Sequence, residues 1–431
     1  MEITPIFVFN MLILVFFVVA FFYQIVYIFV VFRHKHAPYH VAKTFHTYAV
    51  VICAHNEGVV IGELIESVKE QDYPKDKLDV FVFCDNCTDD TAELARAAGA
   101  IVYERPAGGQ IGKSWVMDYG LNCVMRDYPG RYEGFFVFDA DNVLTPNYVR
   151  EMNNVFDEGK YDAVTSYRNS KNFDSSWISR GYGTWFLREA KYLNNARMIL
   201  GTSCAISGTG YLMSAKVIEA MHGWDFHLLT EDIQFSTFAA LNGMCIGYAQ
   251  KAVFFDEQPV TFAASWRQRM RWTKGFYQVL VKYGHNLVHE LRLKNAPKRA
   301  NGRFAVYDML MTLAPAMILT LISVTVNALY LLIGLFFPAI ISASEQQLCV
   351  GALLMTILSF YVVFFLLAIL VEITERKSIH CRKIHLFTNL FTFPLFMLSY
   401  VPIALAAAVQ KVSWVPTKHT ISKSLDDINK E

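Results

Sequence analysis

The feature that most constrains this chain is the way in which uncharged apolar segments enclose a polar middle. Residues 6–32 contain no charged side chain across 27 positions, and two further uncharged runs of 36 and 26 residues lie between Asp308 and Glu345 and between Glu345 and Glu372. Each run exceeds the roughly 20 residues that an α-helix needs to cross a bilayer core about 30 Å thick. The sequence therefore predicts transmembrane helices at both ends and a soluble domain between them.

The composition agrees with a membrane protein and excludes two other classes. The 431 residues are 54% hydrophobic and 18% charged, against about 25% charged in an ordinary soluble domain. This excludes an intrinsically disordered chain. The 39 Lys and Arg balance 38 Asp and Glu, for a net charge of +1, so no basic surplus exists to bind phosphates and we expect no nucleic acid partner.

Charges beside the apolar runs predict the orientation. Only Glu2 precedes the first helix (residues 1–33), whereas Arg33, Lys35 and Lys43 follow it, and the positive-inside rule then places the soluble domain in the cytoplasm. A cleaved signal peptide is the alternative. The run is longer than a typical signal core, and it lacks both a basic start and a small-residue cleavage site. We therefore expect a multi-pass protein of the plasma membrane.

Residues 305–372 are predicted to form an in–out–in transmembrane hairpin. Their connecting loop has no Lys or Arg, and basic residues flank both outer ends: Arg292, Lys294, Lys298, Arg299 and Arg303 before, and Arg376, Lys377, Arg382 and Lys383 after. A third apolar segment, residues 386–410, contains Pro394 and Pro402. It could be interfacial, re-entrant or transmembrane, and we favour the first two because the prolines interrupt helical hydrogen bonding.

Residues 45–260 are predicted to fold as an α/β domain with a mostly parallel sheet. Short β-rich runs at 48–53, 80–84, 135–139 and 163–167 alternate with helical stretches such as 58–71 and 88–98. Ligands of such sheets bind beyond the carboxyl ends of the strands. Eight cysteines are too sparse for a disulfide framework, and Cys84 and Cys87 form a C-x-x-C with no second pair at zinc spacing, so we expect reduced thiols rather than a redox or metal site.

Three motifs carry side chains suited to chemistry. Asp139 and Asp141 follow a buried strand at i and i+2, where an extended chain would place both carboxylates on one face. Hard oxygen donors of this kind suit Mg²⁺ or Mn²⁺ that also coordinates a nucleotide diphosphate. The alternative is a solvated turn after a strand.

The second motif, Thr230-Glu231-Asp232, precedes an apolar helical stretch, so its carboxylates would lie at a helix N-terminus that favours their ionised form. A simple helix cap by Thr230 is compatible with this hypothesis. In the third motif, Gln268, Arg271 and Trp272 share one helix face at i, i+3 and i+4. Arg can hold a pyrophosphate and Trp can stack on a sugar. Residues 261–300 are also predicted to be interfacial and amphipathic.

Together these motifs resemble the processive membrane-embedded family 2 glycosyltransferases, the class of cellulose, hyaluronan, chitin and poly-N-acetylglucosamine synthases. The resemblance extends to 54–57 and 84–91, similar to the first two nucleotide-binding loops, and to Gly208-Thr209-Gly210, similar to the acceptor loop. It covers residues 48–285 closely and implies a GT-A fold. Cys84 and Cys87 depart from the residues common in that loop.

The resemblance implies a role for each matching residue. On the donor side, Glu57 and Asp85 would contact the uridine, Lys113 would contact the phosphates, and Gln268 and Arg271 would hold the diphosphate; Asp139 would contact the nucleotide and the metal, and Asp141 the metal. On the acceptor side, the acceptor sugar would be bound by Gly208, Thr209, Gly210 and Trp272. Glu231 would also bind substrate, and Asp232 would act as the general base. Trp414 and Thr417 in the tail (411–431) resemble a gating loop that closes over the nucleotide. The alternative is an ordinary juxtamembrane tail, and gating requires the tail to be cytoplasmic.

The leading functional hypothesis is an inverting UDP-sugar transferase, using UDP-glucose or UDP-N-acetylglucosamine, that elongates a β-linked polysaccharide processively and couples elongation to secretion. The alternative is a non-processive enzyme that glycosylates a membrane lipid, because few spans make a thin channel without a homodimer or a small membrane accessory subunit. A catalytically inactive scaffold is disfavoured by the complete motif set. The sequence identifies neither the sugar nor the linkage.

Overall fold

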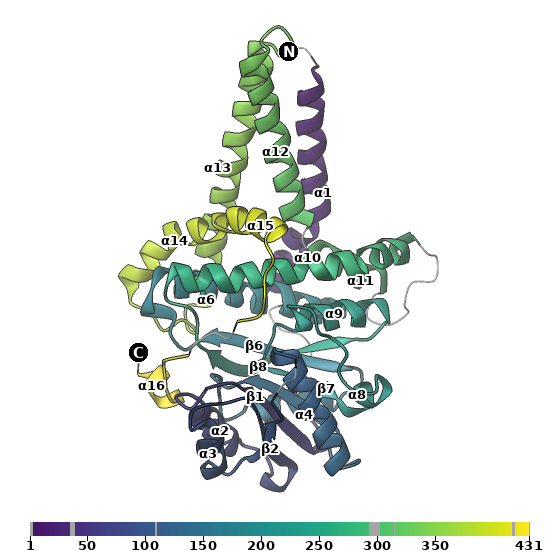
Figure 1. Cartoon of the computed structure of the whole chain (residues 1–431), viewed down its shortest axis with the longest axis vertical. Helices are drawn as coiled ribbons and strands as arrows, with labels where there is room; N and C mark the ends of the chain where they lie inside the picture. The colour runs from purple at the N-terminus through teal and green to yellow at the C-terminus, as the bar shows by residue number, and fades with distance from the viewer. Residues whose placement is uncertain are drawn as a thin grey trace.

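Three long helices stand side by side on a domain built around an eight-stranded sheet (Figure 1). This computed structural model describes residues 3–34, 39–107, 110–292, 302–313, 315–415 and 419–430. Thr417 and the flanking Lys35, Lys294, Lys298 and Arg299 lie outside the described residues.

The strands are β1 (Tyr48–Ala54), β2 (Leu78–Asp85), β3 (Ile101–Arg105), β4 (Gly134–Asp139), β5 (Val143–Leu144), β6 (Ala163–Ser170), β7 (Tyr211–Ser214) and β8 (Ile246–Asp256). The helices of the soluble domain are α2 (Ile61–Lys69), α3 (Thr91–Ala97), α4 (Lys113–Asp127), α5 (Tyr148–Phe156), α6 (Trp177–Glu189), α7 (Asn195–Leu200), α8 (Ala215–Ala220) and α9 (Glu231–Leu241). The remaining helices are α1 (Pro5–His34), α10 (Phe262–Arg292), α11 (Gly302–Thr312), α12 (Pro315–Phe336), α13 (Ala343–Thr374), α14 (Lys383–Leu398), α15 (Tyr400–Val409) and α16 (Leu425–Asn429).

The sheet has the order β3-β2-β1-β4-β7-β6-β8-β5 and is mixed. Strands β1 to β4 pair in parallel, and β6 pairs in parallel with β8, whereas β7 runs antiparallel to both of its neighbours. All four predicted strands are present. The prediction of a mostly parallel sheet is confirmed for the half that carries β1, β2 and β4, and β7 interrupts the parallel pairing of the other half.

Both faces of the sheet are buried, which explains the nearly continuous apolar runs in its strands. In β1, Val50 and Ile52 pack with α2 and α5 on one face, and Ala49 and Val51 pack with α4 on the other. Strand side chains alternate between faces, so an apolar residue at every position requires helices on both sides. The loops that bear polar residues are therefore left at the strand ends.

Among the residues that the structure describes, four helical segments are long and apolar enough to cross a membrane: Pro5–His34, Ala316–Phe336, Ala343–Thr374 and Lys383–Val409. Helices α1, α12 and α13 extend away from the sheet, and the start of α1 lies at the same far end as the α12–α13 connection (Figure 1). Asn10 and Asn327 exchange side-chain hydrogen bonds of 3.0 and 2.8 Å between α1 and α12. Each of these two polar side chains therefore has a partner within the helical bundle.

The fourth segment differs from the other three because it lies across their base (Figure 1). It is divided into α14 and α15 at Ser399. Pro402, the third residue of α15, has no backbone N–H and cannot donate a helical hydrogen bond to the carbonyl of Leu398. This missing bond accounts for the break. Helix α14 packs on α6, and α15 packs on α10. This packing favours the interfacial alternative for residues 386–410 over a transmembrane helix.

Helix α11 is separate from the membrane hairpin that was expected to begin at residue 305. It packs against α9 and α10, and its Asp308 forms a buried ion pair with Arg197, with the Arg197 Nε to Asp308 Oδ2 distance 2.6 Å. The uncharged run therefore begins inside α11, but the upright helix begins at Pro315, where proline is compatible with a first helical turn.

Candidate active site

The predicted nucleotide-binding residues lie at the carboxyl ends of β1, β2 and β4, as expected for a parallel sheet. Asn56 and Asn86, in the two loops that follow β1 and β2, have positive φ values of 57° and 51°. Asn is among the few residues that adopt this conformation readily. Asp85 is 5% exposed and accepts a 3.1 Å hydrogen bond from Arg105.

Asp139 and Asp141 occupy a turn rather than an extended strand. Strand β4 ends at Asp139, and the backbone N–H of Asn142 donates back to the carbonyl of Asp139 at 3.2 Å. The prediction that an extended chain places both carboxylates on one face is therefore wrong, because the chain turns immediately after the first aspartate. The two side chains have different partners.

Lys113 links Asp139 to the loop predicted to contact the acceptor. Its Nζ lies 2.5 Å from Asp139 Oδ1 and donates to the Gly208 carbonyl at 2.6 Å. The Thr209 hydroxyl accepts from the Asp139 backbone N–H at 2.8 Å and donates to Asn142 Oδ1 at 2.5 Å. The loop 208–210 is thus held directly against the turn 139–142.

Asp141 is buried and ionised. Its Oδ2 accepts a hydrogen bond from the Glu257 backbone N–H at 2.7 Å. Burial alone would raise the pKa of Asp141, but the charges of His419 and Lys171 outweigh burial and lower it. An ionised carboxylate at 141 beside a 37% exposed one at 139 is a donor set that suits a hard divalent cation such as Mg²⁺ or Mn²⁺.

Glu231 and Asp232 begin α9 and approach the same loop. A methyl group at Gly208 would lie 3.7 Å from Asp232 Oδ2. Burial raises the pKa of Asp232, and burial together with Asp232 raises the pKa of Glu231 to about 7. A carboxylate with a raised pKa is a stronger base than an ordinary one, which suits proton abstraction from a hydroxyl.

Thr230 does not cap α9 with its side chain, contrary to the capping interpretation. Its hydroxyl is buried without a hydrogen-bond partner among the described residues and lies against Gly275 of α10, where a Cβ would be only 2.5 Å away. Gly275 therefore allows α10 to pass close to the acidic pair.

Gln268, Arg271 and Trp272 lie within the continuous helix α10, so they share one side of it as predicted. Trp272 packs edge-on against Tyr182, with ring centroids 5.7 Å apart, and Arg271 is near enough to Glu231 to lower the pKa of that carboxyl group. Gln268 Oε1 is buried without a hydrogen-bond partner in the described part of the chain. Arg269 points elsewhere and donates to Phe396 O and Ser399 Oγ at 2.9 and 2.8 Å, so it anchors the junction of α14 and α15.

The C-terminal tail lies on the sheet domain and reaches the strand-end loops. Trp414 is close to Gly112, where a Cβ would lie 3.7 Å from the indole ring. His419 Nδ1 is 2.9 Å from Glu57 and its Nε2 is 4.0 Å from Asp141. Burial lowers the pKa of His419, but Asp141 and Glu57 raise it to about 10, so the imidazole is charged.

Sequence reasoning missed His419 and a buried ion pair behind the acceptor loop. Arg168 donates to Asp256 Oδ2 from two nitrogens at 2.9 and 2.5 Å, and to the Ser207 carbonyl at 3.1 Å. A weak signal was present, because Arg168 lies within β6 and Asp256 ends β8, but both strands also contain other polar residues. Of the predicted site residues, Lys113, Asp139 and Asp232 meet at the loop 207–210, whereas Glu57 contacts His419 and Trp272 packs on Tyr182.

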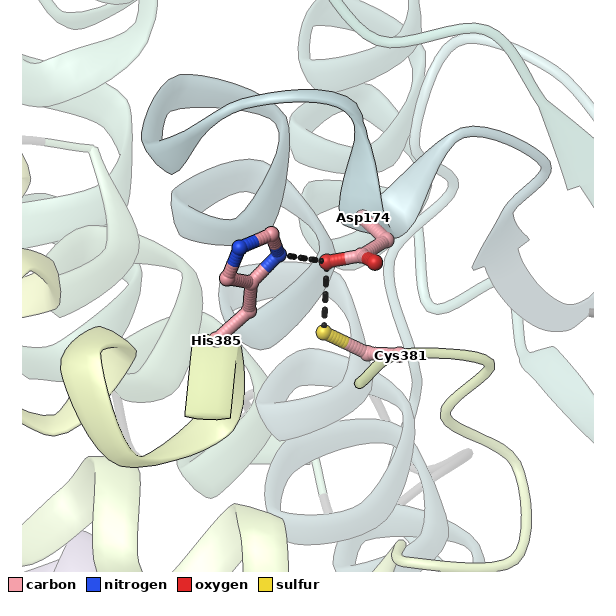
Figure 2. A group of neighbouring side chains, drawn as sticks. All are labelled: Asp174, Cys381 and His385. Carbon is pink, nitrogen blue, oxygen red and sulfur yellow. Dashed lines mark hydrogen bonds and ion pairs between the residues drawn. The ribbon is translucent and has the colours of Figure 1, made fainter. Parts of the chain in front are cut away.

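A separate cluster of Asp174, Cys381 and His385 joins the soluble domain to the start of α14 (Figure 2). Asp174 Oδ1 is 2.5 Å from His385 Nδ1 and accepts from the Cys381 thiol at 3.1 Å. Arg382 and Arg180 approach the same carboxylate at 2.9 and 3.6 Å. Two guanidinium groups already offset its charge, so the cluster fits a hydrogen-bonded latch better than a cation site. Cys84 and Cys87 are free thiols.

Comparisons with known proteins agree with this arrangement. Residues 46–275 match the family described as "Glycosyltransferase like family 2". The beta-monoglucosyldiacylglycerol synthase of Synechocystis sp. is 27% identical over 239 residues, covering 54% of this chain and 48% of that protein. The poly-beta-1,6-N-acetyl-D-glucosamine synthase of Staphylococcus aureus is 24% identical over 244 residues, covering 54% and 55%. The chain spans about half the length of these curated relatives.

Among solved structures, a mannosyltransferase from Pyrobaculum calidifontis, in complex with GDP-Man and Mn²⁺, is similar with a TM-score of 0.50 at 19% identity. The similarity covers 80% of this chain and 98% of the other, and it concerns the fold. The family match covers more than half of the chain, and the mixed sheet and strand-end loops agree with it. The chain belongs to glycosyltransferase-like family 2, and its soluble domain has the GT-A fold.

Proposed function

We propose that this protein is an inverting hexosyltransferase that uses UDP-glucose or UDP-N-acetylglucosamine to extend a β-linked polysaccharide at the cytoplasmic face of the plasma membrane. One observation carries the proposal. Lys113 bridges Asp139 and the Gly208 carbonyl, and Asp232 lies against the same glycine. Donor phosphates, acceptor hydroxyl and general base would therefore meet at one loop.

The proposed donor side consists of the strand-end loops. Glu57 and Asp85 would contact the uridine, and Lys113, Gln268 and Arg271 would hold the diphosphate. Asp139 and Asp141 would hold a divalent cation, Mg²⁺ or Mn²⁺, which supplies positive charge to the departing diphosphate. Lys113 and Arg271 add fixed positive charge where negative charge develops in the transition state.

The proposed acceptor side is the loop 208–210 together with Trp272 and Glu231. Asp232 accepts the proton of the acceptor hydroxyl through a carboxylate oxygen, and the hydroxyl oxygen forms a bond to the anomeric carbon. The bond between that carbon and the diphosphate oxygen breaks, with the electron pair leaving on UDP. A single displacement inverts the anomeric centre, so an α-linked donor yields a β-linked product.

Two observations bear on the acceptor. Trp414 and His419 of the tail contact Gly112 and Glu57 in the donor loops, which favours a closing element over the nucleotide and repeated addition to a glycan. The second candidate is transfer of one sugar to a membrane lipid. It is favoured by the small bundle of α1, α12 and α13, whose helices all contact one another, so secretion of a polymer would need a second copy or a small membrane subunit.

The deciding experiment incubates the purified protein in nanodiscs with Mg²⁺ or Mn²⁺ and each UDP-sugar separately. UDP release and product length are measured, with Asp232→Asn as the inactive control. Release of UDP with a long glycan supports elongation, and a lipid carrying one sugar supports the second candidate. Absence of UDP release with both donors, from a protein whose thermal melt is intact, contradicts the proposal.

A further inference from the structure

A groove lies at the far end of α10, where this helix packs beside α11. It has a volume of about 440 Å³, within the range of about 300–1,000 Å³ that is usual for ligand sites. Its lining includes three apolar side chains, Leu280, Val288 and Leu310, and three with nitrogen donors, His285, His289 and Arg292.

This mixed lining suits a ligand with an apolar part and an anionic part. His285, His289 and Arg292 follow one another at i, i+4 and i+7, so they project from one face of α10. Within the described residues, none of the three forms an ion pair with a carboxylate. Arg forms strong charge-assisted hydrogen bonds with phosphate, a His ring N–H can also donate to it, and hydrocarbon would cover the leucines and valine.

The groove lies at the base of the membrane helices. Leu310 belongs to α11, which ends just before α12 begins at Pro315. The Tyr307 hydroxyl of α11 donates to the Ala20 carbonyl of α1 at 2.6 Å, so α11 lies at the level where α1 leaves the soluble domain. Figure 1 shows α10 lying across the base of the upright helices.

The same face of α10 carries an exposed apolar side chain beside the basic ones. Val281 is 86% exposed and precedes His285 by one helical turn. An exposed valine beside His and Arg is typical of a helix at the level of lipid head groups, where apolar side chains enter the acyl region and basic ones meet phosphates.

We propose that this groove binds an anionic glycerophospholipid, with the phosphate against His285, His289 and Arg292 and an acyl chain against Leu280, Val288 and Leu310. The site is distinct from the acceptor site, because His289 lies roughly 27 Å beyond Arg271 along α10 at 1.5 Å per residue. It does not depend on the proposed glycosyl transfer. A lipid held here fixes one end of the helix whose other end carries Gln268, Arg271 and Trp272.

The test measures lipid retained by the full-length protein after purification in detergent. Native mass spectrometry is performed after incubation with dioleoyl-phosphatidylglycerol or with dioleoyl-phosphatidylcholine. We expect one phosphatidylglycerol to bind in preference to phosphatidylcholine. Arg292→Ala should weaken this binding about fivefold, as expected for one basic residue near anionic lipid, and the triple variant H285A/H289A/R292A should abolish it. Lys216→Ala removes an exposed charge from α8 on the soluble domain and serves as the matched control.

Inorganic phosphate distinguishes a lipid from a free anion. If the acyl chain contributes, 10-fold excess phosphate over lipid should leave the bound phosphatidylglycerol in place. Displacement by phosphate would overturn the lipid assignment. Equal retention by wild type, Arg292→Ala and the triple variant, or equal binding of both lipids, would overturn the site itself. Activity is measured in parallel only as a check of folding, so failure here is separable from failure of the proposed function.

Discussion

Asp232 is the residue on which the proposed chemistry depends most directly. Replacing it with Asn keeps its size but removes the proton acceptor, so we expect the transfer rate to fall about 10²–10⁴-fold. UDP binding should survive, because among the described residues no hydrogen bond joins the Asp232 carboxylate to Lys113 or Asp139. Isothermal titration with UDP and a turnover assay check both parts. Near-normal turnover would remove Asp232 from the role of base.

Glu231 and Asp232 together determine how activity should vary with pH. A base must be ionised, and burial raises the pKa of Asp232, so activity should fall on acidification while ordinary aspartates remain charged. The pKa of Glu231 is about 7, raised by burial and by Asp232. Because the charge of Asp232 raises the pKa of Glu231, Asp232 is already ionised while Glu231 titrates, and Glu231 is protonated when Asp232 titrates. Glu231→Gln should therefore leave the acid limb of kcat/KM in place and remove any step near pH 7. A shifted acid limb would show that Glu231 is charged when Asp232 takes up its proton.

Successive side chains of β6 point to opposite faces of the sheet. Those on one face contact the α13–α14 connection, and Arg168 on the other face contacts the acceptor loop. Tyr167 and Asn169 bind the Glu375 side chain at 2.5 Å and the Ser378 carbonyl at 2.7 Å in the α13–α14 connection. Arg168, facing the other way, binds the Ser207 carbonyl. Arg168→Lys loses the paired contact with Asp256, and we expect the KM for acceptor to rise about 10-fold with the KM for donor unchanged. A lower melting temperature with both KM values unchanged would indicate a purely structural role.

The tail is the second element with a clear prediction. His419 and Trp414 contact the donor loops, and loss of one charge-assisted contact typically costs about 1.5–3 kcal/mol. His419→Ala should therefore raise the KM for the UDP-sugar by about 10-fold or more, measured at saturating acceptor, because the tail would no longer be held over the nucleotide. The exposed Asp426 of α16 offers the control Asp426→Ala. Equal KM values for both variants would favour an ordinary juxtamembrane tail.

At the scale of the whole molecule, the arrangement predicts three membrane crossings. The tail contacts the soluble domain after α14 and α15, so these helices cannot have carried it to the other side. A fluorescent protein fused after Glu431 should fluoresce in the cytoplasm, and alkaline phosphatase fused after Ile340 should be active outside. Phosphatase activity after Glu431 would indicate a fourth crossing and contradict the packed tail.

Local patterns were sufficient for much of the molecule. The uncharged runs predicted the upright helices, because a segment of about 20 uncharged and mostly apolar residues is long enough to cross a bilayer as a helix. The strands β1, β2, β4 and β6 followed from short apolar runs, and the positions of Asp139, Asp141, Asp232 and Gln268 followed from motifs with defined spacing. These features depend on neighbours in sequence.

Features that depend on distant parts of the chain could not be predicted from the sequence. The turn at Asp139–Asp141, the ion pair of Arg168 with Asp256 and the contact of His419 with Glu57 join residues far apart along the chain or depend on what surrounds them. The same is true of 383–409, whose apolar composition suits a crossing while its packing on α6 and α10 keeps it at the base. Composition determines which surfaces avoid water, and long-range contacts determine which partner covers them.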